Sequence, residues 1–246
     1  MPKKRYGLIG KNIGYSFSKN YFTERFVQEN WTDCSYENFD IQEISEFSKL
    51  IKDNPDLAGL NITIPYKESV IPFLDKLSKK ARKIGAANVV RFTKKGELKG
   101  YNSDCYGFKK ALKPLLKPHH KKALILGTGG ASKAIAFALE ELDITSTFVS
   151  RKESSETFTY EEINKNTFDE HQIIINCTPV GTFPHIEEFP PVPYLFFSEK
   201  HIAFDLIYNP EETQFLKRAK ENGAQTKNGY EMLVFQAEKS WKIWHK

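Results

Sequence analysis

The chain has 246 residues, 40% of them hydrophobic and 13% aromatic, which is enough apolar material for one large or two modest domains and excludes general disorder. The formal charge of +5 comes from separated lysine pairs with acids between them, a pattern typical of a solvated surface rather than a nucleic-acid groove. No apolar run reaches the roughly 18 residues of a membrane span, and the N-terminus lacks a signal-peptide core, so a cytoplasmic protein is expected.

The first hundred residues alternate strand and helix signals. Strands are predicted at 6–9, 35–39 and 57–63, with amphipathic helices between them, the first capped by Ser18 and the second spanning 44–51. This alternation favours a largely parallel sheet. Two helical stretches within 69–83 and a hairpin formed by 88–92 and 98–101 complete the first domain.

A second strand–helix series begins near residue 121. The apolar strand 123–126 runs into a glycine-rich turn and the predicted helix 131–142. Further buried strands are predicted at 147–149, 173–176 and 202–206, and a proline-rich loop lies between the last two. The final predicted helix, 230–244, carries so much apolar surface that it is expected to pack on both domains.

The glycine turn, Gly127-Thr128-Gly129-Gly130, indicates a dinucleotide site, because such a turn presents backbone N–H groups and a positive helix end to a pyrophosphate. Ser132 stands where the third glycine of GxGxxG would be, and a purely structural turn is the alternative. The next strand runs into Ser150-Arg151-Lys152 rather than the acid of NAD-selective folds. These cations favour NADP, unless they are ordinary solvated residues.

Lys67 is a candidate catalytic residue because the segment 61–67 places polar groups at the end of a predicted strand, where open α/β sheets bind ligands. A single lysine is more often a surface residue, so a partner is needed. Asp104 is one candidate partner and is equally a candidate helix N-cap. The sequence alone does not show that the two side chains meet.

Cysteines and histidines give no sign of a metal site. Cys34, Cys105 and Cys177 are widely spaced and form no CxxC pair, which also argues against a disulfide framework. The six histidines show neither HExxH spacing nor grouping with cysteines. No metal is therefore expected.

The chain resembles the shikimate dehydrogenase family at separated motifs that follow the family order over nearly the whole length. Segment 61–67 resembles NxTxPxK and 205–210 resembles DxxYxP; the other resembling segments are 6–10, 15–18, 85–88, 102–104, 127–131, 176–181 and 229–237. The resemblance implies that Lys67 and Asp104 are catalytic. The substrate-binding residues that it implies are Ser16 and Ser18 for a carboxylate, with Asn61, Thr63, Asn88, Tyr208 and Gln236. The cofactor-binding residues expected from the turn and the resemblance are Gly127, Thr128, Gly129, Gly130, Ala131, Ser150, Arg151, Lys152, Thr178 and Gly229.

The implied fold is α/β, with an N-terminal α/β substrate domain (1–104) built on a mostly parallel sheet and a Rossmann-like NADP-binding domain (105–228). A cleft is expected between them, and the C-terminal helix (229–246) is expected to pack back on the first domain. The chain departs from the family pattern at Ala87, Val89 and Ser103, at Tyr230-Glu231, and at Ser150-Arg151-Lys152.

The implied activity is the reversible NADPH-dependent reduction of 3-dehydroshikimate to shikimate in the chorismate pathway of aromatic amino acid biosynthesis. The alternatives are a sister enzyme acting on quinate or another carboxylated cyclic polyol, and a non-catalytic nucleotide-binding protein. Retention of both Lys67 and Asp104 argues against the latter. The expected partner is a small molecule, not nucleic acid or membrane, and both a monomer and a homodimer are compatible with the sequence.

Overall fold

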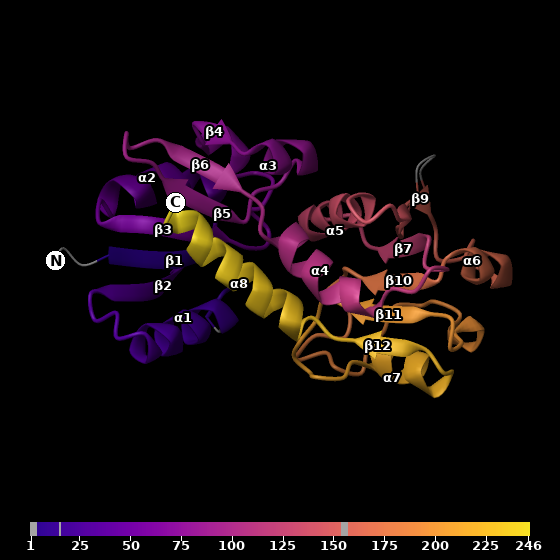
Figure 1. Cartoon of the computed structure of the whole chain (residues 1–246). Helices are drawn as coiled ribbons and strands as arrows, with labels where there is room; N and C mark the ends of the chain where they lie inside the picture. The colour runs from indigo at the N-terminus through magenta and orange to yellow at the C-terminus, as the bar shows by residue number, and fades with distance from the viewer. Residues whose placement is uncertain (1–3, 15, 154–156) are drawn as a thin grey trace. The chain divides into compact units, whose positions relative to one another are not determined.

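The computed structural model describes residues 4–14, 16–153 and 157–246 (Figure 1). The chain divides into two units, of which unit 1 contains residues 1–103 and 237–246 and unit 2 contains residues 104–236. Tyr15, part of the expected serine motif, lies outside the described residues. Within the described part of the chain, no helix is long and apolar enough to cross a membrane.

The sheet of unit 1 has six strands in the order β2-β1-β3-β5-β6-β4. Strands β1, β2 and β3 are parallel, β5 and β6 form the expected antiparallel hairpin, and the short β4 lies parallel to β6 at the edge. The strands are β1 (Lys4–Gly10), β2 (Cys34–Asp40), β3 (Leu57–Ile62), β4 (Lys76–Leu77), β5 (Val89–Phe92) and β6 (Leu98–Tyr101).

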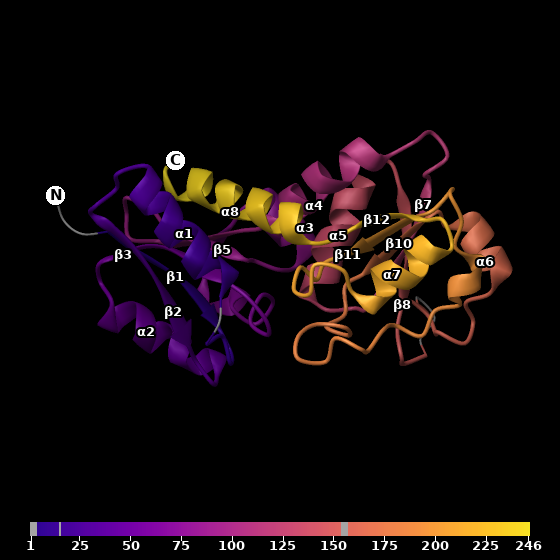
Figure 2. The ribbon, with the colours of Figure 1, turned by 90° about the horizontal axis from the view of Figure 1, so that it is seen from below.

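Alternate residues of these strands build two separate cores, one on each face of the sheet. Leu8 on β1 packs with Phe22 of helix α1 (Phe17–Gln28), whereas its neighbour Ile9 packs with Phe47 of helix α2 (Phe47–Asp53). Figure 2 shows α1 and α2 on opposite faces of β1 to β3. Because successive side chains of a strand point to opposite faces, the position along the strand determines which helix each residue packs against.

The sheet of unit 2 has the order β12-β11-β10-β7-β8-β9, and every neighbouring pair is parallel. Counted from β7, this is the doubly wound 3-2-1-4-5-6 order of dinucleotide-binding folds. The α/β fold class expected from the sequence is thus confirmed. The strands are β7 (Lys122–Leu126), β8 (Thr145–Val149), β9 (Thr157–Phe158), β10 (Ile173–Asn176), β11 (Ile202–Asp205) and β12 (Gln225–Lys227).

Helices cover both faces of this second sheet. On one face, Phe108 of helix α4 packs edge-on against Phe204 of β11, with ring centroids 4.9 Å apart. A core that contains Leu124 of β7 also includes Phe168 and Phe215. The helices are α4 (Asp104–Leu112), α5 (Gly130–Glu140), α6 (Lys165–Glu170), α7 (Gln214–Glu221) and α8 (Tyr230–Trp244). The remaining α-helix, α3 of unit 1, spans Lys79–Ile84. The 3₁₀ turns of the two units are η1 (Ile44–Glu46), η2 (Ile71–Phe73), η3 (Lys113–Leu115) and η4 (Tyr194–Phe196).

Helix α8 begins in unit 2 and ends in unit 1, and each part packs within its own unit. In unit 2, α4 lies so close to it that a Cβ at Gly107 would stand 2.5 Å from the carbonyl oxygen of Met232. In unit 1, Trp241 stacks on Trp31 with centroids 4.3 Å apart, and Trp244 donates its indole N–H to Val90 O at 3.1 Å. The apolar side chains seen in the sequence therefore have partners at both ends of the helix.

Two sequence predictions on helix caps need correction. Ser16, not Ser18, caps α1: its hydroxyl accepts from Lys19 N, and Ser18 lies inside the helix. The two helical stretches predicted within 69–83 are the 3₁₀ turn η2, which contains Pro72, and the α-helix α3. Asp104 is the first residue of α4 rather than a cap preceding it.

Candidate functional site

The glycine turn of unit 2 has the geometry of a phosphate-binding loop. Gly127 has a φ of +102°, which glycine adopts without strain, and its N–H donates to Val149 O at 2.9 Å. The N-cap of the eleven-residue helix α5 is Gly129, which provides no side-chain cap, and a Cβ built there meets no atom within 4 Å. The helix N-terminus is thus sterically open beside Gly129, and these residues fit a pyrophosphate.

The third-glycine position is filled by Ser132, which is completely buried. Its hydroxyl donates to Gly129 O at 2.5 Å, so the serine stabilises the turn from inside. The departure from GxGxxG is therefore accommodated without a side chain at the open side of the loop.

Thr178 lies beside this turn because β10, which it follows, pairs in parallel with β7 at the point where the strand order of the sheet reverses. Cys177 N donates to Leu126 O at 3.0 Å, and the Thr178 methyl is 3.1 Å from the Cβ position of Gly127. The Thr178 hydroxyl donates to Asn176 Oδ1 at 2.6 Å. Ligands of open α/β sheets bind at such a switch point. The structure therefore brings Thr178 and the glycine turn together, as expected for a shared site.

Ser150, Arg151 and Lys152 follow β8, whose last residue pairs with the last residue of β7. Arg151 and Lys152 are exposed, and the Ser150 hydroxyl accepts from Lys152 N at 3.1 Å. Burial raises the pKa of Tyr160, and the nearby positive charge of Arg151 opposes that rise. Two exposed cations thus follow the strand next to the glycine turn, a place that fits a 2′-phosphate.

A buried carboxylate supports the neighbouring loops of unit 2. Asp205, fully buried at the end of β11, accepts from Thr213 Oγ1 at 2.6 Å, from Asn176 Nδ2 at 3.1 Å and from Ile207 N at 3.0 Å. Burial raises its pKa to about 6, and the three donors act in the opposite direction. Thr213 also caps α7 by accepting from Leu216 N. The DxxYxP resemblance marked Asp205, but it did not indicate Thr213.

Gly229 and Tyr208 belong to the loops near the buried Asp205. Gly229 N donates to Ile207 O at 2.9 Å, and a Cβ at this position would overlap the carbonyl oxygen of Leu206. Close backbone packing therefore requires glycine at position 229 independently of any ligand. Tyr208 is half-buried in the loop that joins β11 to α7.

The expected carboxylate-binding serines stand at the start of α1, in the loop that follows β1. Ser16 Oγ accepts the capping hydrogen bond from Lys19 N at 3.3 Å, and both Ser16 and Ser18 are buried. An anion is stabilised at a helix N-terminus, so this position suits the carboxylate that the resemblance implies.

A buried polar network joins several expected substrate-binding residues of unit 1. Asn61, 4% exposed, accepts from the Tyr36 hydroxyl at 2.9 Å and donates to Asn88 O at 3.2 Å and to Ser240 Oγ at 2.9 Å. Asn88 donates to Ser103 Oγ at 3.0 Å and accepts from Ser103 N at 2.6 Å. The Ser103 and Ser240 hydroxyls lie 3.2 Å apart. Tyr36, Ser103 and Ser240 were not among the predicted site residues.

Lys67 lies in the turn that follows β3, and its side chain is half-buried. Its carbonyl oxygen accepts from Ala87 N at 2.7 Å, and the preceding Tyr66 donates its hydroxyl to Ile41 O at 2.8 Å. Thr63, also half-buried, fits against Gly10, where a Cβ would stand 2.5 Å from the threonine methyl. These contacts fix the backbone that carries Lys67.

The expected catalytic pair is divided between the units, since Lys67 belongs to unit 1 and Asp104 to unit 2. Asp104, 5% exposed, is the first residue of α4. Gln236, also buried, is the last residue of unit 2, on α8.

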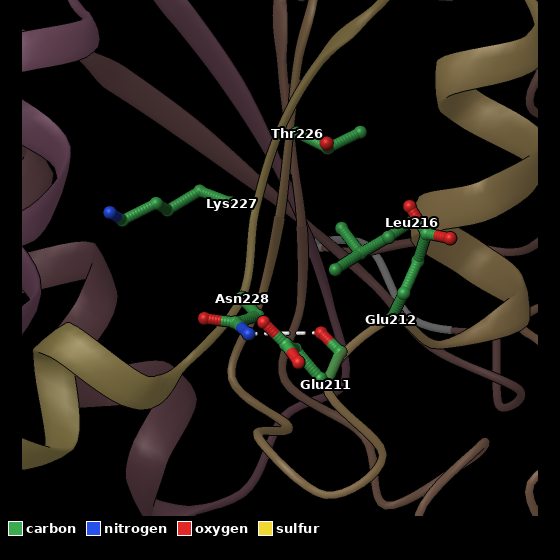
Figure 3. Close-up of a pocket in the computed structure, with 6 residues that line it drawn as sticks. All are labelled: Glu211, Glu212, Leu216, Thr226, Lys227 and Asn228. Carbon is green, nitrogen blue, oxygen red and sulfur yellow. Dashed lines mark hydrogen bonds between the residues drawn. The ribbon is translucent and has the colours of Figure 1, made fainter.

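A pocket of about 490 Å³ lies in unit 2 beside β12 and the start of α7, and Figure 3 shows the side chains that line it. Its lining holds two exposed glutamates, and Asn228 donates to Glu211 O at 2.9 Å. The pocket is lined by Glu211, Glu212, Leu216, Thr226, Lys227 and Asn228, none of them an expected site residue. In the described ranges, no group of three His, Cys, Asp or Glu side chains is placed to hold a metal ion.

The doubly wound sheet, the open glycine turn at its switch point and the polar strand ends of a second α/β unit define a dinucleotide-binding protein with a separate substrate unit. A family model described as the shikimate dehydrogenase substrate binding domain matches residues 8–90. The shikimate dehydrogenase (NADP(+)) of Caldicellulosiruptor saccharolyticus is 36% identical over 265 residues, covering 98% of this chain and 92% of that protein. The chain belongs to the shikimate dehydrogenase family, and the expected oxidoreductase class is confirmed.

Solved structures agree with this assignment. A chorismate mutase/shikimate 5-dehydrogenase fusion protein from Clostridium acetobutylicum superposes with a TM-score of 0.86 at 34% identity, covering 99% of this chain and 92% of that one. Shikimate 5-dehydrogenase from Thermus thermophilus, solved with NADP(H) and shikimate, gives 0.85 at 30% identity, covering 98% and 92%. NADP is named for the Caldicellulosiruptor enzyme and for the Thermus structure, in agreement with the predicted cofactor.

Proposed function

We propose that this chain catalyses the reversible, NADP-dependent interconversion of 3-dehydroshikimate and shikimate in aromatic amino acid biosynthesis. The observation that carries the proposal is that this member of the family has two candidate sites, one in each unit. Unit 2 has an open glycine turn at its switch point, and unit 1 has a buried cluster of serine and asparagine side chains at the ends of its parallel strands. The first suits a dinucleotide and the second suits a small carboxylated polyol.

In unit 1, the substrate carboxylate would bind the hydroxyls of Ser16 and Ser18 at the start of α1. The ring hydroxyls would face the amide and hydroxyl groups of the remaining expected side chains. Such fixed contacts hold one ring carbon in a reactive position, which is a large part of enzymatic rate acceleration. These residues are Asn61, Thr63 and Asn88 of unit 1, with Tyr208 and Gln236 of unit 2.

Lys67 would supply the proton chemistry. As an ammonium group it donates a proton to the oxygen of the ring ketone as that oxygen gains negative charge, and as an amine it accepts the proton back in the reverse direction. Asp104 would orient Lys67 and stabilise its charged form. NADPH, when bound, supplies the hydride.

In unit 2, the cofactor pyrophosphate would bind the N–H groups around Gly127 to Ala131, with Thr128, Gly129 and Gly130 between them. The 2′-phosphate would bind Ser150, Arg151 and Lys152, and Thr178 and Gly229 would line the same site. The open Cβ position of Gly129 and the two exposed cations after β8 support this placement.

We also propose that the enzyme works in the cytoplasm as a monomer or homodimer, without a nucleic-acid partner. Its three cysteines form no disulfide among the described residues, which suits a reducing compartment.

The test is NADPH formation by the purified chain with about 1 mM shikimate, a typical substrate concentration, with quinate and NAD exchanged in separately. We expect turnover to be highest with shikimate and NADP. Higher turnover with quinate would identify the sister activity. No turnover with any pair, while NADP binding is retained, would leave a nucleotide-binding protein and overturn the proposal.

Lys67→Ala provides the residue-level test in the same assay. We expect kcat to fall by at least about a hundredfold, the lower range for loss of an acid–base group, while shikimate binding changes little. An unchanged kcat would contradict the role given to Lys67.

A further inference from the structure

Hydrogen bonds within unit 1 fix both the oxygen and the nitrogen of the Asn61 side-chain amide. Its oxygen accepts from the Tyr36 hydroxyl, and its two amide hydrogens have two acceptors, the backbone oxygen of Asn88 and the hydroxyl of Ser240. An amide nitrogen carries only two hydrogens, so both are used within the protein. Asn61 therefore has no N–H left to offer a substrate, and a direct contact would have to use its oxygen.

Tyr36 connects this amide to the carboxylate-binding end of the site. Its hydroxyl donates to Asn61 Oδ1 at 2.9 Å, and it lies close enough to Ser18 for that side chain to influence its pKa. Burial raises the pKa of Tyr36, and the nearby Ser18 side chain opposes that rise, so the phenol stays protonated and can donate to Asn61. The ring itself is fixed, because it is 3% exposed and stacks on Phe22 with centroids 4.8 Å apart.

Ser240 extends the same network toward Asn88. It accepts from Asn61, and its oxygen lies 3.2 Å from that of Ser103, which both accepts from and donates to the Asn88 side chain. Asn61 and Asn88 are thus linked through the hydroxyl groups of Ser240 and Ser103, and Asn61 is bonded to Tyr36, which lies near Ser18. These residues include side chains from α1, β2, β3 and α8, which are far apart in sequence.

We propose that Tyr36 and Ser240 are positioning residues of the substrate site: together they fix the Asn61 amide, and Tyr36 couples it to the nearby Ser18. This inference rests on the proposed function, because it assigns Ser18 and the asparagines to the substrate. Neither positioning residue needs to touch the substrate. Each acts by limiting the rotamers of side chains that do, so that less ordering is required when the substrate binds.

Tyr36→Phe is the main test, since it removes one hydroxyl and keeps the stacked ring. We expect KM for shikimate to rise about fivefold, the factor that corresponds to one net hydrogen bond, while KM for NADP stays within about twofold. Tyr6→Phe is the matched control: Tyr6 is the strand neighbour of Tyr36, equally buried, and its hydroxyl contacts His245 instead of the site. It should leave both KM values unchanged.

Ser240→Ala is the second variant, and it reaches the same amide from the other end. We expect a similar rise in KM for shikimate. Ser35→Ala is its control, because the Ser35 hydroxyl is buried and has no hydrogen-bond partner in the part of the chain described. If Tyr36→Phe failed to fold, the Ser240 pair would decide the question alone.

A double-mutant cycle separates positioning from general loss of stability. If Tyr36 acts through Ser18, the KM of Ser18→Ala/Tyr36→Phe should rise by less than the product of the two single rises. Ser18→Ala/Tyr6→Phe should give the full product. Unchanged KM in both Tyr36→Phe and Ser240→Ala, or full multiplicativity in the first cycle, would overturn the inference. Activity of the unaltered chain with shikimate is measured first, so a failed inference is distinguishable from a failed function.

Discussion

Replacing Thr213 by valine should destabilise unit 2 more than its single lost hydroxyl suggests. The hydroxyl donates to buried Asp205 at 2.6 Å and also accepts the capping bond of α7 from Leu216 N. A hydrogen bond to a charged group contributes about 1.5–3 kcal/mol, and an N-cap about 1 kcal/mol. Because valine has nearly the same shape, no cavity is created. We therefore expect a loss of about 3 kcal/mol in the free energy of unfolding at neutral pH.

The pH dependence of this loss follows from the pKa of Asp205, which burial raises from 3.8 to about 6. The stability linked to that shift is fully present below pH 3.8 and is lost as the pH rises through about 6. The Thr213 hydroxyl stabilises the ionised carboxylate, so its removal matters most above that pH. We expect Thr213→Val to cost less stability at pH 5 than at pH 8, each chosen about one or two units from the folded pKa.

Urea unfolding followed by circular dichroism measures both effects, and the transition that NADP shifts upward identifies unit 2. Thr213→Ser keeps the hydroxyl and is the control, expected to lose less than about 1 kcal/mol. A loss below about 1 kcal/mol for Thr213→Val at both pH values would refute the dual role of this side chain.

Two further predictions concern the cofactor site. Gly229→Ala should lower the thermal midpoint strongly or prevent folding, because the added methyl group overlaps Leu206 O. Gly129→Ala should fold normally and raise KM for NADP. Equal thermal midpoints for the two variants would contradict the packing argument. Arg151→Ala should raise KM for NADP by about tenfold, as one charge-assisted phosphate contact is lost, with little change in KM for NAD; equal effects on both cofactors would exclude a 2′-phosphate contact.

Much of the fold could be predicted because its central strands are short buried apolar runs and its long helices have a regular apolar period. β4, β9 and β12 were missed, since strands of two or three residues carry no recognisable alternation. Ser18 was taken as the cap of α1 because a serine is a good cap at either of two nearby positions, and only the backbone decides which one is used.

The site could be predicted only where a motif stays local in the sequence. The segment with Lys67 and the glycine turn are such motifs, and the structure places each after a strand. Ser240 could not be predicted, because its bond to Asn61 joins residues 179 positions apart. Tyr36 likewise looks like an ordinary strand residue until folding brings its hydroxyl to Ser18 and Asn61.

The most direct test of the proposed function is the reduction of 3-dehydroshikimate by this chain with NADPH, with the organic product identified by chromatography. We expect one shikimate to form for each NADPH consumed, and the product to be lost when Lys67 is replaced by alanine. NADPH consumption without shikimate, or no reaction although both compounds bind, would contradict it.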